Sequence, residues 1–356
     1  MPIYVVKDVL PVILGSQLKN AILSGSNNIS KYKKQINELN IFPVPDGDTG
    51  TNMSMTIGTA VTELRKSEPA TVEQAASVTA SALLRGARGN SGVILSLLFR
   101  GLSKALKGRE TADAAAFAAA MQEGVSAAYK AVMKPAEGTI LTVSRLAAAR
   151  AADAARATPN DPEAVLEAAI AEGQLALENT INQNPVLKKA GVVDAGGKGF
   201  LVILQGMLDS MRGLPLPEES GDHAKPEQKT DYAAIAAEEI TFTFDTVFIV
   251  RKTTRKSLEA FQAYLNSIGD SLVIGEDDDA FKVHVHTDIP GAALTEAQKY
   301  GTLELAKIEN MRTQAEDLAA GRHIQSTDDL EEADHSHAGR NAAPVSYTHL
   351  RAHETL

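Results

Sequence analysis

The stretch NIFPVPDGDTGTN, residues 40–52, separates two segments in which apolar side chains recur at helical spacing. Two prolines stiffen its first half. They lead into the tight turn Asp46-Gly47-Asp48, after which apolar residues from Met53 to Leu64 repeat every three or four positions. The stretch therefore predicts a structured turn that ends in the first residues of a helix.

The same spacing extends in both directions, from about residue 7 to residue 212, with short turns rich in Gly, Asp, Asn and Pro between the segments. Alanine-rich helices are expected at 72–84, 112–132 and 163–182, and their methyl side chains let two helix axes approach closely. No run of alternating β-branched residues occurs in this half. Residues 1–212 are therefore expected to form an all-α domain.

The composition changes after this half. Residues 213–235 are rich in Pro, Glu, Lys and Gly without periodicity, and they are expected to form an exposed linker. Residues 236–322 follow a β-α-β-β-α pattern, which predicts a small α/β domain. Its helices and strands are expected at 242–250, 257–268, 271–274, 281–286 and 292–300.

The fourth of these segments alternates valines with Lys282, His284 and His286. Such alternation predicts a half-buried strand with both histidines on the face opposite the valines. Two imidazoles at positions i and i+2 can share a zinc ion if further ligands come from Asp, Glu or water. The alternative is an ordinary exposed polar face of a strand.

The end of the chain differs again. Residues 323–356 show no apolar periodicity and are expected to be disordered. Residues 345–356 have no relation to what precedes them and are expected to be non-native, the foreign end of a reading frame truncated near Pro344. The natural protein would then be longer than this chain.

Composition excludes several classes of protein. The 356 residues include 45 acidic and 35 basic side chains, a net charge of −10, which argues against a nucleic-acid-binding surface. The absence of cysteine excludes disulfides and thiol nucleophiles. No apolar run reaches the ~20 residues of a membrane-spanning helix, and the N-terminus lacks the layout of a signal peptide. A soluble cytoplasmic protein is expected.

Asp46 and Asp48 place two carboxylates on one turn, where they repel each other unless a cation lies between them. Mg²⁺ prefers such oxygen ligands and leaves coordination positions for substrate phosphates. The helix start that follows offers backbone N–H groups to an anion. Together these features predict a metal–nucleotide site, and an Asx-turn that caps the helix is the alternative.

Three further turns precede helices in the same way, at residues 85–92, 137–142 and 194–199. Their glycines let a ligand approach the backbone closely, but each turn alone is compatible with a helix cap or a connection between helices. Four such turns at helix ends predict that one rim of the helical domain holds a polyphosphate and a nucleoside.

On residues 40–53, 86–92, 137–143 and 194–199, the chain resembles the nucleotide-binding domain of the dihydroxyacetone-kinase L subunit, the DhaL-like or DAK2 family. It resembles more closely still the ATP-binding subunit of bacterial fatty acid kinase, over about residues 5–320. The resemblance implies an antiparallel helical barrel that holds ATP or ADP at one rim through two magnesium ions, followed by a small α/β middle domain.

The resemblance also implies roles for individual residues. Asp46 and Asp48 match the magnesium-binding aspartates of the catalytic centre, and Asn40 falls near a third metal ligand, where the dihydroxyacetone kinase has an aspartate. The residues that match nucleotide-binding positions are Thr49, Gly50, Thr51, Asn52, Asn90, Ser91, Gly138, Thr139, Asp194, Gly196 and Gly197.

In the middle domain, the resemblance implies a zinc site that the family builds from one cysteine and two histidines. His284 and His286 match the histidines, and Asp245 stands in place of the cysteine. Aspartate can bind zinc through oxygen. The resemblance further implies a homodimer through the middle domain, and a fatty-acid-binding partner protein that a C-terminal domain absent from this chain would engage.

The expected function is that of an ATP-dependent kinase subunit that phosphorylates the carboxylate of a fatty acid carried by the partner, giving an acyl phosphate. Such a transfer requires no catalytic His or Cys, since a carboxylate is already ionised at pH 7. Two alternatives remain open. One is a glycerone (dihydroxyacetone)-type kinase subunit, whose partner holds a hydroxy-ketone covalently on a histidine. The other is a nucleotide-binding regulator without turnover.

Overall fold

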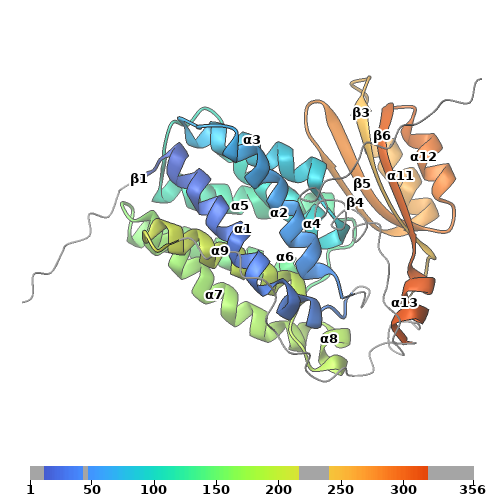
Figure 1. Ribbon diagram of the computed structural model, residues 1–356, viewed down its shortest axis with the longest axis horizontal. Helices are drawn as coiled ribbons and strands as arrows, with labels where there is room; N and C mark the ends of the chain where they lie inside the picture. Colours follow the sequence, from blue (N-terminus) through green and yellow to red (C-terminus); the bar gives the residue numbers. More distant parts are fainter. Residues whose placement is uncertain (1–11, 43–46, 216–239, 320–356) are drawn as a thin grey trace, which may run out of the picture.

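The computed structural model describes residues 12–42, 47–215 and 240–319, which form a helical domain and a sheet domain side by side (Figure 1). Asp46, most of the predicted linker and the predicted tail at 323–356 lie outside the described residues. The expected fold class, an all-α domain followed by a small domain of strands and helices, is confirmed.

The helical domain consists of long helices that pack on their neighbours in chain order, and the last of them returns to the first and closes a barrel. Within the described ranges, each helix is too short or too polar to span a bilayer. The helices are α1 Gly15–Glu38, α2 Thr49–Arg65, α3 Val72–Gly86, α4 Gly89–Ala105, α5 Ala114–Ala131, α6 Ile140–Ala157, α7 Pro162–Gln183, α8 Pro185–Ala190 and α9 Ala195–Met211.

One feature of this half differs from the all-α expectation. A short antiparallel pair joins β1 (Val12–Ile13), just before α1, to β2 (Ala112–Asp113), just before α5. Each strand has two residues, so neither produces a periodic pattern that could have been recognised.

Side chains at the helix starts explain where several helices begin. Thr71 accepts a hydrogen bond from the backbone N–H of Gln74 at 3.2 Å, at the start of α3. Asp161 accepts one from Ala164 at 2.9 Å, and Pro162 occupies the first position of α7. Each cap satisfies an N–H group that the helix itself leaves unpaired, so these boundaries follow from local sequence.

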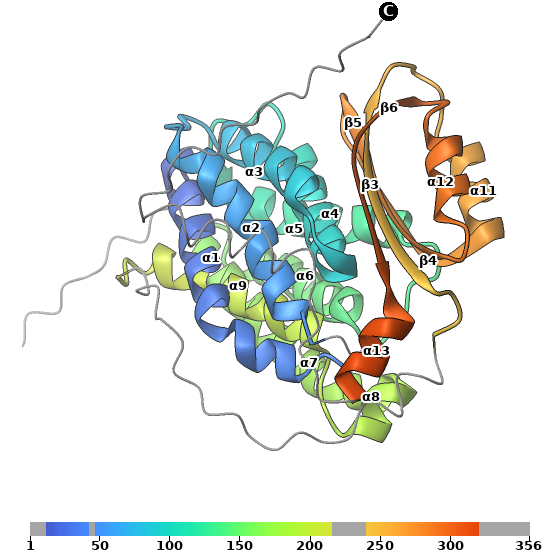
Figure 2. The same cartoon turned by 45° about the vertical axis from the view of Figure 1, so that its right-hand side comes forward.

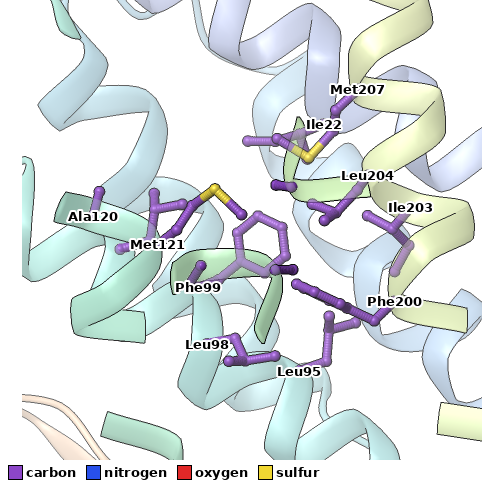
Figure 3. Packing of buried hydrophobic residues seen from close by; sticks show 14 of the residues in the cluster. Ile22, Leu95, Leu98, Phe99, Ala120, Met121, Phe200, Ile203, Leu204 and Met207 are labelled. Atoms are coloured by element: carbon purple, nitrogen blue, oxygen red, sulfur yellow. The ribbon is translucent and has the colours of Figure 1, made fainter. Parts of the chain in front are cut away.

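Apolar side chains from α1, α4, α5 and α9 fill the interior of the barrel (Figure 3). Phe99 and Phe200 lie at the centre of this view, with methionine and branched aliphatic side chains around them. The cluster contains mostly Ala, Leu, Ile and Val, which agrees with the alanine-rich helices predicted from the sequence. This core is what holds the ends of the helices in fixed relative positions.

The helices α1 and α9 approach each other through glycines. A Cβ added at Gly206 would lie 2.6 Å from the carbonyl oxygen of Ser24 and 2.8 Å from the Cα of Gly25. The two backbones are therefore in direct contact, which only glycine at this position allows. This contact closes the barrel.

Asp194 caps the start of α9. Its Oδ2 accepts a hydrogen bond from the backbone N–H of Gly197 at 2.6 Å, and the residue is buried. Burial raises the pKa of the Asp194 carboxyl to about 6, although backbone hydrogen bonds from Gly197 and Ile140 act in the opposite direction. The cap thus contains a carboxylate whose ionised form the fold disfavours.

The sheet domain has an antiparallel sheet in the order β4-β5-β3-β6. The sequence predicted its first five elements in the correct order but missed the last strand and helix. The missed strand, β6, lies at the edge of the sheet and carries charged side chains, so its apolar alternation is weak. The elements are β3 Phe244–Lys252, α11 Glu259–Ile268, β4 Gly269–Glu276, β5 Ala280–Thr287, α12 Pro290–Ala297, β6 Gly301–Asn310 and α13 Met311–Ala319.

The expectation that the strand carrying the histidines is half-buried is wrong, because β5 is buried on both faces. Phe281, Val283 and Val285 belong to the apolar cluster that the sheet forms with α11 and α12. The opposite face of the sheet lies toward the helical domain (Figure 2). The polar residues of β5 are therefore covered by the helical domain rather than by solvent.

We expect Gly206→Ala to lower the free energy of unfolding by about 1–3 kcal/mol, because the added methyl forces α1 and α9 apart. Gly58→Ala is the matched control, since a Cβ there meets nothing within 4 Å. It should stabilise the protein by about 0.5–1 kcal/mol. Thermal unfolding followed by circular dichroism measures both, and an unchanged midpoint for Gly206→Ala would contradict the contact between the helices.

Asp194→Asn should remove a pH-dependent destabilisation. A carboxyl whose pKa is raised in the folded state makes the fold lose stability as pH rises from about 4 to about 6, and the loss persists above that range. Asn keeps an acceptor for the cap and carries no charge. We expect the variant to be more stable than wild type at pH 8, by up to about 3 kcal/mol, and to differ little at pH 4.

Urea unfolding at the two pH values tests this expectation, and the pH 4 measurement is its internal control. If the free energy of unfolding changes equally between the two pH values in wild type and Asp194→Asn, the Asp194 carboxylate does not destabilise the fold.

Candidate functional site

A cavity of about 890 Å³ lies between one rim of the helical barrel and the sheet. Its helical wall comes from the starts of α2, α4, α6 and α9, together with the ends of α3 and α5. Its other wall comes from β3, β4, β5 and β6. The cavity thus combines parts of both domains.

Each of the four turns singled out from the sequence contributes to this cavity. The first N–H groups of a helix have no intrahelical acceptor, and the helix dipole is positive at that end. Helix starts that meet at one cavity therefore favour a ligand with negative charge. The predicted site residues that line the cavity from the helical side are Asn40, Asp48, Thr49, Asn52, Asn90, Ser91, Thr139, Asp194 and Gly196.

Asp48 stands at the N-cap position of α2 and is partly buried in the cavity wall. Its side chain makes no capping hydrogen bond to α2, unlike the Asx-turn alternative. Asn40 is buried beside it, and its Oδ1 accepts a hydrogen bond from the Thr49 hydroxyl. Asp46, the other predicted magnesium ligand, lies outside the described residues.

Four other predicted binding residues support the turns and are not part of the cavity wall. Gly50 packs against the α1 backbone, where an added Cβ would lie 2.2 Å from the Lys33 carbonyl oxygen. The Thr51 hydroxyl accepts a hydrogen bond from Asn37 of α1 at 3.0 Å. Gly138 lies against the end of α7, and Gly197 lies against Val143 and Leu177.

The second turn, between α3 and α4, rests on α2. Gly89 has a positive φ of 55°, and a Cβ there would lie 2.5 Å from the Asn52 amide nitrogen. The backbone N–H of Arg88 donates to the hydroxyl of buried Thr56 at 3.1 Å. The turn that carries Asn90 and Ser91 is thereby fixed relative to the turn that carries Asp48.

The third turn, before α6, is organised by a carboxylate. Glu137 accepts hydrogen bonds from the Tyr129 hydroxyl at 3.0 Å, from Thr142 at 2.7 Å and from Arg145 at 2.8 Å. Thr139 caps α6 by accepting a hydrogen bond from Leu141. This turn is held by its own side chains, which fixes the position of Thr139 at the cavity.

The register of the sheet brings its polar side chains together. Asp245 on β3 pairs with His286 on β5 and with Glu309 on β6. One row further along, Val247 pairs with His284 and with Lys307. Residues paired across strands share a face, so these polar groups form one surface directed at the rim of the barrel.

The histidine pair lies at the same cavity as the residues predicted to bind the nucleotide. Asp245, His284 and His286 line the same cavity as Asp48. The charge of Asp48 contributes to raising the pKa of Asp245, after the larger effect of burial. This placement follows from the packing, since the sheet covers the rim with its polar face.

The two imidazoles face each other and two carboxylates. Their Nε2 atoms lie 3.2 Å apart. The Nδ1 of His284 is 3.4 Å from Asp245 Oδ1, and the Nδ1 of His286 is 3.5 Å from Asp270 Oδ1. Among the described residues, Asp245, His284 and His286 form a group whose potential ligand atoms all lie within 4.8 Å of one another.

This group has the donors that a zinc ion requires. Two nitrogens at ~2.0–2.1 Å from a tetrahedral ion are about 3.3 Å apart, close to the observed separation. In the described part of the chain, Asp245 Oδ1 and His284 Nδ1 are buried without a hydrogen-bond partner. Burial lowers the pKa of His284 well below its ordinary value, so its imidazole is neutral and can act as a ligand.

Among the charged residues of the cavity that were not predicted as site residues are Arg88, Lys282 and Lys307. Burial lowers the pKa of Lys282 to about 7. A signal for Lys282 was available, because it precedes His284 by two positions and therefore shares its strand face. Lys307 lies on the strand that was not predicted, so nothing placed it near the site.

Two family models match the chain. Residues 43–209 match the model described as DAK2 domain. Residues 241–318 match the model that describes the middle domain of fatty acid kinase A-like subunits. The residues matched by the first model include the four helix starts that line the cavity. The residues matched by the second model include the sheet on its other side.

Several curated proteins are similar to the chain. Protein YloV of Bacillus subtilis (strain 168) is 42% identical over 313 residues, which is 84% of this chain and 56% of that protein. The uncharacterized protein SSP1546 of Staphylococcus saprophyticus is 39% identical over 316 residues, 87% of this chain and 57% of that protein. The chain thus spans little more than half the length of these relatives.

A solved structure is also similar over part of the chain. The native-form crystal structure of the dihydroxyacetone kinase of C. freundii has 20% identity and a TM-score of 0.41, and the match covers 54% of this chain and 34% of that one. The domain assignment rests on the two family models. The chain therefore contains a DAK2 domain at residues 43–209, followed at residues 241–318 by a domain of the kind found in the middle of fatty acid kinase A-like subunits.

Proposed function

We propose that the chain is the nucleotide-binding part of a kinase that phosphorylates the carboxylate of a fatty acid, carried by a partner lipid-binding protein, with ATP. The observation that carries the proposal is the cavity in which the starts of α2, α4, α6 and α9 meet around Asp48. The match of the sheet domain to the middle domain of fatty acid kinase A-like subunits supports this acceptor over others.

The proposed roles follow from the positions of the side chains. Asp48, with Asn40 beside it and Asp46 two positions earlier in the sequence, would hold magnesium, which neutralises the charge on phosphate oxygens when it is bound. Backbone N–H groups at the starts of α2 and α4 would bind the phosphates, with Asn90 and Ser91 as neutral donors. Thr139, Asp194 and Gly196 would complete the nucleotide site on the opposite part of the rim.

The sheet would provide the wall on the side of the acceptor. A carboxylate acceptor is already ionised, so the protein has to position it and offset negative charge rather than remove a proton. The cavity wall includes Arg88 and Lys307, whose positive charges lower that repulsion. Enclosure between two domains also keeps water away from the reacting phosphoryl group.

We also propose that His284 and His286 hold zinc through Nε2, with Asp245 in the position of the third protein ligand. The spacing of the two Nε2 atoms and the buried Asp245 Oδ1, which has no hydrogen-bond partner, support the proposal. Asp270 would orient His286 from the outer side, because a carboxylate that accepts from Nδ1–H fixes the tautomer of a metal-bound imidazole.

The two alternatives differ from this proposal in the acceptor or in the fate of the nucleotide. A glycerone-type kinase would use the same nucleotide site with a hydroxy-ketone as acceptor. A regulator would retain its nucleotide through gel filtration, whereas a kinase exchanges labelled ATP rapidly with the solution. The homodimer through the sheet domain remains a prediction, which light scattering can test.

Asp48→Asn should weaken binding of Mg·ATP at least tenfold, a change of about 1.4 kcal/mol. The substitution keeps the shape of the side chain and removes the charge that would face the cation. Isothermal titration calorimetry with and without magnesium measures the difference, which should disappear when magnesium is omitted. Asp153→Asn, an exposed aspartate on α6 paired with Arg156, is the control. Equal magnesium-dependent affinities for both variants would refute the metal assignment.

His284→Ala should abolish zinc binding, and Asp245→Cys should tighten it, because a thiolate is the softer ligand. Competition with a chromogenic chelator measures both affinities without any need for activity. Ser267→Cys adds a thiol on an exposed position of α11 and is the control for the cysteine itself. Wild type and His284→Ala holding zinc equally would exclude the site.

A further inference from the structure

One side chain of the sheet domain reaches across the boundary into the second turn of the helical domain. The Nζ of Lys282 donates hydrogen bonds to the backbone carbonyl oxygens of Arg85, at 3.2 Å, and of Ala87. Lys282 is only 3% exposed, so the contact is buried between the domains. It joins residues almost two hundred positions apart in the chain.

The two carbonyl groups belong to the end of a helix. Arg85 is in the last turn of α3, and Ala87 is its C-cap. Carbonyl groups at this end have no intrahelical donor, and the helix dipole is negative there. An ammonium group is therefore a favourable partner for them, and the two bonds offset part of the cost of burying its charge.

The same turn is held from its other side by α2. Arg88 N–H donates to the Thr56 hydroxyl, and Gly89 lies against Asn52. Immediately after Gly89, Asn90 and Ser91 line the cavity. The turn is thus fixed between α2 of its own domain and β5 of the sheet domain.

We propose that Lys282 is a positioning residue, through which the sheet domain sets the conformation of the turn at 85–91 that carries Asn90 and Ser91. The consequence for nucleotide binding rests on the proposed function. The contact itself does not depend on the proposed function, because all of its partners are groups of the protein.

Other contacts are available to hold the domains together. Val132 forms an isolated antiparallel bridge with Val273 of β4, and the N–H of Met133 donates to the Leu272 carbonyl oxygen at 3.5 Å. Gly275 of β4 lies so close to α3 that an added Cβ would be 2.9 Å from a methyl group of Leu84. Loss of the Lys282 ammonium should therefore release the turn while the domains remain docked.

The test is hydrogen exchange of the full chain without nucleotide. In Lys282→Met, which keeps most of the apolar length of the side chain, we expect amides of residues 86–92 to exchange about tenfold faster than in wild type. Amides in α1, α5 and α9 should be unchanged. Lys282→Gln should give the same result, because its amide nitrogen ends one bond short of the Nζ position. If Lys282→Met does not fold, Lys282→Gln is used for the test instead.

Lys252→Met is the matched control. Lys252 is a partly buried lysine of the same sheet, and its Nζ also binds a backbone carbonyl, that of Asp277 at 2.7 Å, and the Glu276 carboxylate at 2.8 Å. Both partners lie within the sheet domain. Its loss should leave exchange at 86–92 unchanged. Equal exchange there in Lys282→Met and wild type, or faster exchange spread evenly over both domains, would overturn the proposal.

A second readout connects the contact to ligand binding. The dissociation constant for Mg·ADP should rise about five- to tenfold in Lys282→Met and stay unchanged in Lys252→Met, a shift of about 1–1.4 kcal/mol. If wild type binds no nucleotide, the proposed function fails, whereas the exchange result still decides the role of Lys282. If wild type does bind Mg·ADP, faster exchange at 86–92 with unchanged affinity would refute the part of the proposal in which the turn positions Asn90 and Ser91 for the nucleotide.

Discussion

The interaction on which the site depends is the one between the positive ends of α2, α4, α6 and α9 and the negative groups around them. These helix starts bring unpaired N–H groups of like partial charge to one cavity. The same cavity contains the carboxylates of Asp48, Asp194 and Asp245. Carboxylates attract a cation, and N–H groups bind anionic oxygens. A cavity that contains both therefore suits a ligand that combines the two, as a metal-bound polyphosphate does.

The two domains make this arrangement possible in different ways. Closure of the barrel by direct backbone contact of α9 with α1 brings its fourth helix start to the rim. In the sheet domain, apolar and polar side chains alternate along β5, so each face of this strand contacts a different part of the molecule. Its apolar face packs on α11 and α12, and its polar face covers the rim. A strict two-residue period thus places Lys282, His284 and His286 together on the face that lines the cavity.

Local signals were enough to predict most of the helices and the four turns, because caps, prolines and apolar spacing act within a few residues, as at Thr71 and Asp161. They were not enough for β6, whose place at the sheet edge depends on pairing with β3. Nor could they show that β5 is buried on both faces, or that Gly50 and Thr51 pack on α1 rather than line the cavity. Each of these outcomes is decided by contacts between distant parts of the chain.

The attachment of the sheet to the barrel is one-sided. Among the described residues, the most extensive contacts between the domains join α4 and α5 to β4 and β5, and they include the bridge between Val132 and Val273. Moving the sheet away along that side would break backbone and buried packing contacts, whereas β6 lies at the opposite edge of the sheet. Any change in the angle between the two domains is therefore expected to turn about the β4 edge, which makes the β6 side of the cavity the more variable one.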